Sequence, residues 1–125
     1  MRIAELNHVA IEVRDVARTV DFYRRVLQLE SLPRPDFDFP GHWFRLGTTQ
    51  ELHIIGPRGH AAQAGSRGNH FALMIDDAGA WEAKLTREGA HFMPMKVRPD
   101  GACQLFVQDP DGHWIELCTP PGTAK

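Results

Sequence analysis

Two similar stretches decide the fold of this chain: Asn7-His8-Val9-Ala10-Ile11-Glu12-Val13-Arg14-Asp15 and Asn69-His70-Phe71-Ala72-Leu73-Met74-Ile75-Asp76-Asp77. Each begins with Asn-His and ends at an aspartate. Between these ends, apolar residues recur with the period of two that is typical of a half-buried strand. Two copies of one pattern in a chain of 125 residues indicate an internal repeat.

A helical pattern follows each copy. The first covers about residues 16–28, and Asp15 is its candidate N-cap. The second can be capped by Asp76 or Asp77, and Gly89 suits its C-terminal end. One apolar stripe marks each predicted helix, formed by Val16, Val20, Tyr23 and Leu27 in the first and by Ala78, Trp81 and Leu85 in the second.

The final strands repeat as well, because Leu52-His53-Ile54-Ile55-Gly56-Pro57 aligns with Ile115-Glu116-Leu117-Cys118-Thr119-Pro120. Each half therefore reads β-α-β-β-β, which predicts an α+β fold of two tandem βαβββ modules. We expect one domain over residues 1–125, with modules at about 1–58 and 69–121 and a Gly-, Ala- and Ser-rich linker at about 59–68. The intervening strand candidates are residues 30–32, 43–46, 92–97 and 103–108.

Asp109-Pro110-Asp111-Gly112 is the clearest turn signal in the chain. Proline suits position i+1 of a type I turn, and Gly112 can adopt the left-handed conformation that closes a three-residue hairpin loop. In this register Phe106 opposes Glu116 and Gln104 opposes Cys118. Cys103 then faces Thr119, so a disulfide between the two cysteines is disfavoured.

Composition narrows the class of protein. The net charge is −2, from 14 basic and 16 acidic residues, and no basic stripe stands out, so we expect no nucleic-acid partner. No apolar run approaches the ~20 residues that span a bilayer. Residues 1–6 lack the apolar core of a signal peptide, so we expect a cytoplasmic protein with no membrane partner.

Strand periodicity separates the histidines from the core. In the first strand His8 shares a face with Ala10, and in the fifth strand His70 shares a face with Ala72, while the bulky aliphatic residues point the other way. The same alternation places His53 and Glu116 opposite the aliphatic residues of their strands. Imidazole and carboxylate groups are ligands of divalent transition metals. The repeat thus predicts a ligand set of His8, His53, His70 and Glu116.

Each of these residues also has a plainer interpretation. A single strand histidine is more often a hydrogen-bonded residue than a metal ligand, and Glu116 alone would suit a solvent-facing edge. Placement of all four residues at matching positions of the repeat favours the ligand interpretation. The other histidines have no repeat partner of ligand type, and we expect them at the surface or beside the ligands: His42, His60, His91 and His113.

The chain resembles the vicinal oxygen chelate superfamily, which includes glyoxalase I, fosfomycin-resistance thiol transferases, methylmalonyl-CoA epimerase, extradiol dioxygenases and bleomycin-resistance proteins. The resemblance covers nearly the whole chain. It rests on the two Asn-His strands and on two further segments, Asp21-Phe22-Tyr23-Arg24-Arg25-Val26-Leu27 and Phe106-Val107-Gln108-Asp109-Pro110-Asp111-Gly112-His113-Trp114-Ile115-Glu116-Leu117.

This resemblance implies paired βαβββ modules that form a half-open β-barrel around a metal, in a homodimer. It also implies metal ligands at His8, His70 and Glu116, with a fourth often at the position of His53. In some members two chains complete each site. The implied cofactor is a divalent ion such as Zn, Ni, Co, Mn or Fe.

One departure bears on the chemistry. Glyoxalase I carries a carboxylate at the position of His53, and histidine there leaves three imidazoles and one carboxylate, a net charge of +1 with a divalent ion. The metal would be a stronger Lewis acid, and proton abstraction would fall to Glu116.

The leading hypothesis is therefore a metal-dependent, glyoxalase-like lyase or isomerase whose small substrate chelates the metal through vicinal oxygens. Alternatives within the same fold are a thiol transferase of the fosfomycin-resistance type and an extradiol-type dioxygenase. An alternative of a different class is a non-catalytic, ligand-sequestering protein of the bleomycin-resistance type.

Overall fold

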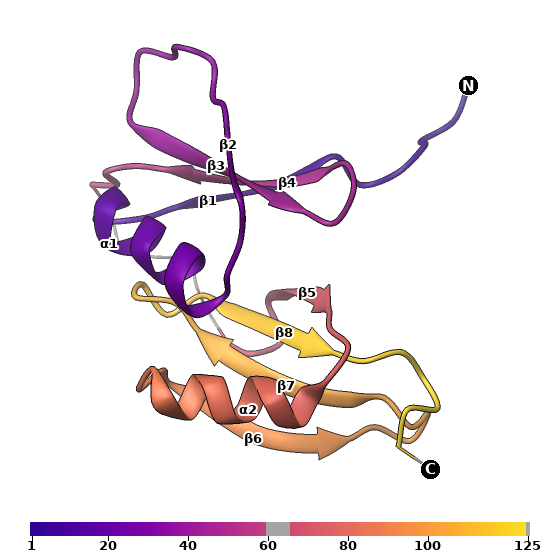
Figure 1. Cartoon of the computed structure of the whole chain (residues 1–125). Coiled ribbons are helices and arrows are strands. Elements are labelled where there is room, and N and C mark those ends of the chain that lie inside the picture. The colour runs from indigo at the N-terminus through magenta and orange to yellow at the C-terminus, as the bar shows by residue number, and fades with distance from the viewer. Residues whose placement is uncertain (60–65, 125) are drawn as a thin grey trace. The chain divides into compact units, whose positions relative to one another are not determined.

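Each of the two repeats forms a four-stranded sheet in a computed structural model of the chain, which describes residues 1–59 and 66–124 (Figure 1). The structure divides into two compact units, Met1–Ala62 and Gln63–Lys125. The fold is α+β, as predicted. Residues 60–65, which include His60 and most of the predicted linker, lie outside the described residues.

The elements of each unit follow the predicted order. Unit 1 contains β1 (His8–Glu12), α1 (Val16–Asp21), η1 (Phe22–Val26), β2 (Ser31–Leu32), β3 (Gly41–Leu46) and β4 (Gln50–Ile55). Unit 2 contains β5 (His70–Met74), α2 (Ala78–Arg87), β6 (Phe92–Val97), β7 (Cys103–Gln108) and β8 (Trp114–Cys118).

The two sheets have the same topology. Their strand orders are β1-β4-β3-β2 and β5-β8-β7-β6, with a parallel pairing between the first and last strands of each unit and antiparallel pairings elsewhere. The order places the two strands that carry candidate ligands side by side within each unit. Among the described residues, no helix is long and apolar enough to cross a membrane.

The first helix differs from the expected single α-helix. It begins as predicted, because an Asp15 side-chain oxygen accepts the Arg18 N–H at 3.1 Å. After Asp21 the backbone widens into the π-helical segment η1, in which the Leu27 N–H bonds to the Phe22 carbonyl. The wider turn changes which side chains face the sheet. Tyr23 and Leu27 of the predicted stripe are buried, whereas Val16 and Val20 are only half-buried; Thr19, Phe22 and Val26 complete the buried set.

The second helix has the predicted ends. The Asp77 side chain accepts the Ala80 N–H at 3.0 Å and so caps the first turn. At the other end Gly89 has a φ of 67°, and the Ala90 N–H bonds back to the Leu85 carbonyl at 3.0 Å. Glycine suits this left-handed position because it has no Cβ to clash.

The β7–β8 hairpin confirms the predicted register. Phe106 pairs with Glu116 and Gln104 with Cys118, and Gly112 has a φ of 91°. The Asp109 N–H bonds to the His113 carbonyl at 3.0 Å, which closes the three-residue loop. The Thr119 N–H bonds to the Cys103 carbonyl, and both cysteines are free thiols. This hairpin fixes where Glu116 lies on the sheet.

Loss of the Asp109 carboxylate is expected to destabilise this hairpin. Asp109 is 5% exposed, and its Oδ1 accepts the backbone N–H groups of both Asp111 and His113, each at 2.9 Å. An Asp109→Ala variant leaves these donors without their partner, at a cost of about 2 kcal/mol in the free energy of unfolding. Urea denaturation measures this difference. Asp36→Ala, at an exposed aspartate of another loop, is the control, and an equal effect of the two variants would contradict the assignment.

Each sheet has one face on the core and one open face. The core face of unit 1 carries Val13, Leu52 and Ile54, all fully buried, and the helix covers it. In β1 and β5 the exposed positions alternate with half-buried ones, so His8 and His70 point away from the core as predicted. The predicted ligands of each unit thus share the open face of their sheet.

Candidate metal-binding site

In unit 1 the structure brings His8 and His53 together. Parallel pairing of β1 with β4 sets Ala10 opposite His53, and the small alanine leaves space above the sheet. The imidazole rings of His8 and His53 stack with centroids 4.1 Å apart. The Trp43 indole stacks on the other side of His53 at 4.0 Å, with an interplanar angle of 1°. His53 is therefore held between two rings.

Hydrogen bonds orient these two imidazoles. His8 Nδ1 lies 2.7 Å from the Asn7 side-chain oxygen, so Nδ1 donates and the Nε2 lone pair stays available. His53 Nε2 lies 2.9 Å from a Glu51 carboxylate oxygen, which leaves Nδ1 as the ligand atom when the ring is neutral. The Asn7 side chain thus orients the His8 ring.

Glu51 is a further polar residue beside His8 and His53 that the sequence reasoning did not identify. It pairs with His8 across the two strands and shares a face with His53, two residues along β4. Strand alternation places Glu51 on the same face as His53, and this could have been seen in the sequence. Glu51 was missed because its counterpart in the second half is Trp114, a residue type that does not bind metals. A carboxylate that accepts the N–H of a ligand histidine fixes the ring and raises its basicity.

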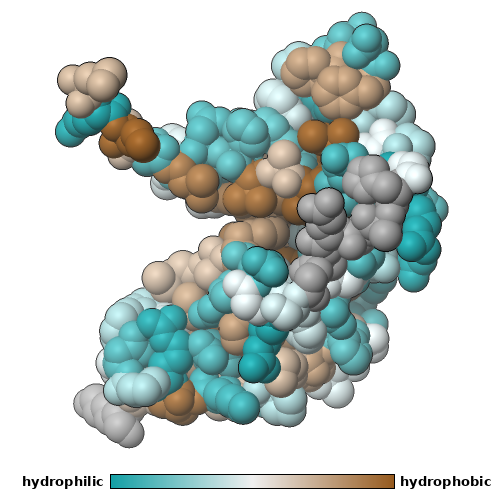
Figure 2. Space-filling view, turned by 180° about the vertical axis from the view of Figure 1, so that it is seen from behind, coloured by the Kyte–Doolittle hydropathy of each residue, from teal (hydrophilic) through white to brown (hydrophobic). Residues whose placement is uncertain are grey.

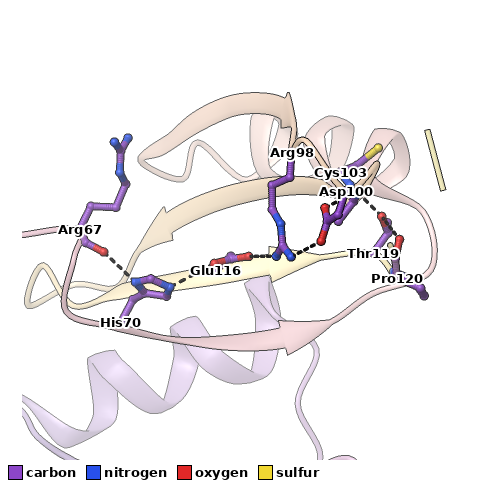
Figure 3. Close-up of polar contacts among 9 residues, drawn as sticks. Arg67, His70, Arg98, Asp100, Cys103, Glu116, Thr119 and Pro120 are labelled. Atoms are coloured by element: carbon purple, nitrogen blue, oxygen red, sulfur yellow. Dashed lines mark hydrogen bonds and ion pairs between the residues drawn. The ribbon is translucent and has the colours of Figure 1, made fainter. Parts of the chain in front are cut away.

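In unit 2 His70 and Glu116 lie next to each other on β5 and β8 (Figure 3). His70 Nε2 is 3.1 Å from Glu116 Oε1, and His70 Nδ1 is 2.7 Å from the Arg67 carbonyl oxygen. A carbonyl can only accept, so Nδ1 carries the proton. In the neutral ring Nε2 is then an unprotonated lone pair that faces a carboxylate oxygen.

When the His70 ring is neutral, Nε2 and the facing Glu116 oxygen are two acceptors in contact, an arrangement that a cation would stabilise. Glu116 is 7% exposed, and its Oε2 is buried with no hydrogen-bond partner. The nearest cation is the Arg98 guanidinium, whose Nη1 lies 3.6 Å from Oε2. A buried carboxylate with an unsatisfied oxygen is costly unless charge is supplied. An imidazole and a carboxylate in this arrangement fit a divalent transition metal.

The polar chain continues beyond Glu116 along the sheet (Figure 3). Arg98 Nη2 bonds to Asp100, and the hydrogen bond and charge of Arg98 lower the pKa of Asp100. This pairing holds Arg98 beside Glu116. Cys118 lies two residues from Glu116 on β8, and its burial, followed by the negative charge of Glu116, raises the pKa of its thiol. Cys118 is therefore a neutral thiol at pH 7, not an activated nucleophile.

The four predicted ligands thus form two pairs, His8 with His53 and His70 with Glu116, one in each unit. Among residues 1–59 and 66–124, no three His, Cys, Asp or Glu side chains gather as a ready metal site. The structure therefore gives the orientation of each pair and its partners, while the joint four-ligand set stays a prediction.

The other histidines in the described part of the chain contact different side chains from those of the two pairs. His42 is on the core side of β3, where its Nε2 bonds to Ser31 at 2.8 Å. Burial, followed by the charges of Arg24 and Arg34, lowers its pKa, so it is neutral at pH 7. His113 bonds to Asp109 in the hairpin loop, and His91 is exposed.

This chain is similar in sequence to a known protein family and in fold to solved structures. The profile of the Glyoxalase/Bleomycin resistance protein/Dioxygenase superfamily matches residues 5–117. Glyoxylase I 4 of Arabidopsis thaliana is 30% identical, with 94% of this chain and 72% of that protein aligned. Metallothiol transferase FosB of Bacillus licheniformis is 26% identical, with 94% and 77% aligned. The crystal structure of a glyoxalase family protein from Bacillus anthracis has a TM-score of 0.81 at 23% identity, with 95% and 97% covered, which shows the fold alone.

Proposed function

Because the chain belongs to the Glyoxalase/Bleomycin resistance protein/Dioxygenase superfamily, we propose that it is a metal-dependent lyase or isomerase of the glyoxalase type. Its substrate is a small molecule that chelates the metal through two neighbouring oxygens. The observation that carries this proposal is the His70–Glu116 pair, in which Nε2 and Oε1 lie 3.1 Å apart while the buried Oε2 has no hydrogen-bond partner and an ion pair with Arg98 at 3.6 Å.

The proposed ligands are His8, His53, His70 and Glu116. His70 and Glu116 are supported by their geometry, and His8 and His53 by the repeat and by their matching strand positions. The proposal includes the arrangement that the family resemblance implies, which is one domain of two modules in a half-open barrel, in a homodimer.

The chain's own residues have distinct roles in this reaction. A bound divalent ion supplies Lewis-acid polarisation of the two substrate oxygens. The Glu116 carboxylate accepts a proton from the substrate carbon beside one oxygen and returns it to the neighbouring carbon. The Arg67 carbonyl fixes the His70 ring by accepting its Nδ1 proton, and Arg98 keeps the Glu116 carboxylate in place.

Metal reconstitution tests the proposal. The purified protein is stripped with a chelator and reloaded separately with Zn, Ni, Co, Mn and Fe, and isomerisation of the hemithioacetal of glutathione and methylglyoxal is followed spectrophotometrically. We expect turnover with at least one ion and its loss on chelation. Absence of turnover with all five ions would end the glyoxalase version of the proposal.

Transfer of a thiol to an epoxide is the second candidate. It is favoured by the relative that is a metallothiol transferase, and it needs the same kind of metal site. The same five metal-loaded samples, offered a thiol and an epoxide antibiotic, distinguish the two reactions by product mass.

A further inference from the structure

The loop between β2 and β3 exposes two phenylalanines. Phe37 is 44% exposed and Phe39 is 40% exposed, and the loop shows hydrophobic atoms on its surface in Figure 2. Both rings lie on one short segment, and they stack with centroids 5.2 Å apart. Exposed apolar side chains that gather in one place indicate a binding surface.

Specific contacts hold this loop in its shape. Arg34 Nη2 donates to the Phe39 carbonyl at 3.0 Å, and its guanidinium carbon lies 4.9 Å from the centroid of each phenylalanine ring. Gly41 makes room for Arg34, because a Cβ there would lie 2.9 Å from Nη2 and 2.5 Å from the Ile54 carbonyl oxygen. Arg34 therefore holds the loop in contact with Gly41 at the start of β3.

Beneath the loop lies a hollow of about 250 Å³ that reaches the histidine pair. Its lining includes Phe37, Phe39 and Trp43, together with His8, His53 and Arg34. Phe37 is tilted by 47° against Trp43 at a centroid distance of 6.1 Å, so the two rings are not stacked on each other. An apolar cavity of about 150 Å³ is enough to bind benzene.

The charge of the lining restricts what it can bind. The lining contains one guanidinium and no carboxylate, and Arg34 Nε is buried without a hydrogen-bond partner. The Arg34 guanidinium offsets the negative charge of Glu51, which lies behind the lining at 2.9 Å from His53 Nε2. An aromatic ring finds several ring faces and edges to pack on.

We propose that this hollow binds an aromatic ring of the substrate beside the atoms that chelate the metal. The substrate class is then an aryl compound with two vicinal oxygens, such as an aryl 2-hydroxy acid or the hemithioacetal of an aryl α-ketoaldehyde. This inference rests on the proposed function, because it takes His8 and His53 as ligands next to the ring site.

Mandelate and lactate test the proposal, since both chelate through a hydroxyl and a carboxylate and differ only in a phenyl or a methyl group. Titration calorimetry on the Zn²⁺-loaded protein is expected to show mandelate binding about 10- to 100-fold more tightly. Phe37→Ala should reduce this preference to a few-fold, with Phe37→Leu intermediate. Val97→Ala, at an exposed apolar residue of β6, is the matched control and should keep the full preference.

The same titrations with a chelator separate the two proposals. A phenyl preference that depends on Phe37 and needs Zn²⁺ supports both. A preference of the same size with Zn²⁺ and with chelator supports the ring site and contradicts the metal function. Zn²⁺-dependent binding of both acids without a preference, a preference unchanged by Phe37→Ala, or no binding of either acid overturns the ring site.

Discussion

A Glu116→Gln variant is expected to lose about 10³-fold in turnover of the hemithioacetal and to bind its metal more weakly. Glutamine keeps the shape and can donate a hydrogen bond to His70 Nε2, but it removes the negative charge and the basic oxygen. Both proposed roles of Glu116, metal ligand and proton acceptor, need that charge. Steady-state kinetics and metal analysis of the purified variant measure the two losses separately.

Glu30→Gln is the matched control for this change. Glu30 is a 71% exposed carboxylate that pairs with Arg45 at the surface, so its loss should leave both turnover and metal content unchanged. If Glu116 served only as a hydrogen-bond partner of His70, Glu116→Gln would keep the metal and the activity. That result would contradict the metal-site assignment.

Removal of the His70 imidazole is expected to have the second large effect. A His70→Ala variant loses the Nε2 lone pair that is the proposed ligand atom. Its metal affinity should therefore fall by about 100-fold or more, beyond the 10–100-fold typical of residues that hydrogen-bond to a metal ligand. Competition with a chromogenic chelator measures this affinity. Added imidazole should restore part of the binding, because it can occupy the vacated space.

His91→Ala provides the control in the same unit. His91 is exposed, and its ring centroid lies 6.4 Å from that of Trp114. This variant should bind metal as the unaltered protein does. Equal metal affinity in the His70→Ala variant, with its fold intact by circular dichroism, would show that the His70–Glu116 contact is a structural ion pair.

Sequence reasoning predicted the elements that depend on local chemistry. Asp77 and Gly89 bound α2 as expected, because capping and left-handed backbone preferences act over a few residues. The β7–β8 register followed from the turn residues, since loop length fixes which residues face each other. The placement of His70 and Glu116 away from the aliphatic face followed from strand alternation, and the parallel pairing of β5 with β8 then brings the two side chains together.

Other features could not be predicted in this way. The π-helical segment η1 was missed because a widened turn and an α-helical turn show similar apolar spacing over so few residues. Glu51 was missed because nothing in the second half mirrors it. The hollow under the β2–β3 loop was missed because it depends on Arg34 and Gly41 meeting across the sheet edge.

By itself, the sequence determined two copies of one module, the faces of their strands and the residue types that can bind a metal. Periodicity and turn chemistry are local, so the printed order of residues carries them. The tertiary structure decided which atoms of those residues are available. The Arg67 carbonyl takes the Nδ1 proton of His70, and Glu51 and Trp43 hold His53. Such partners meet only when separate strands pair, because a hydrogen bond or a ring stack needs atoms within a few ångströms.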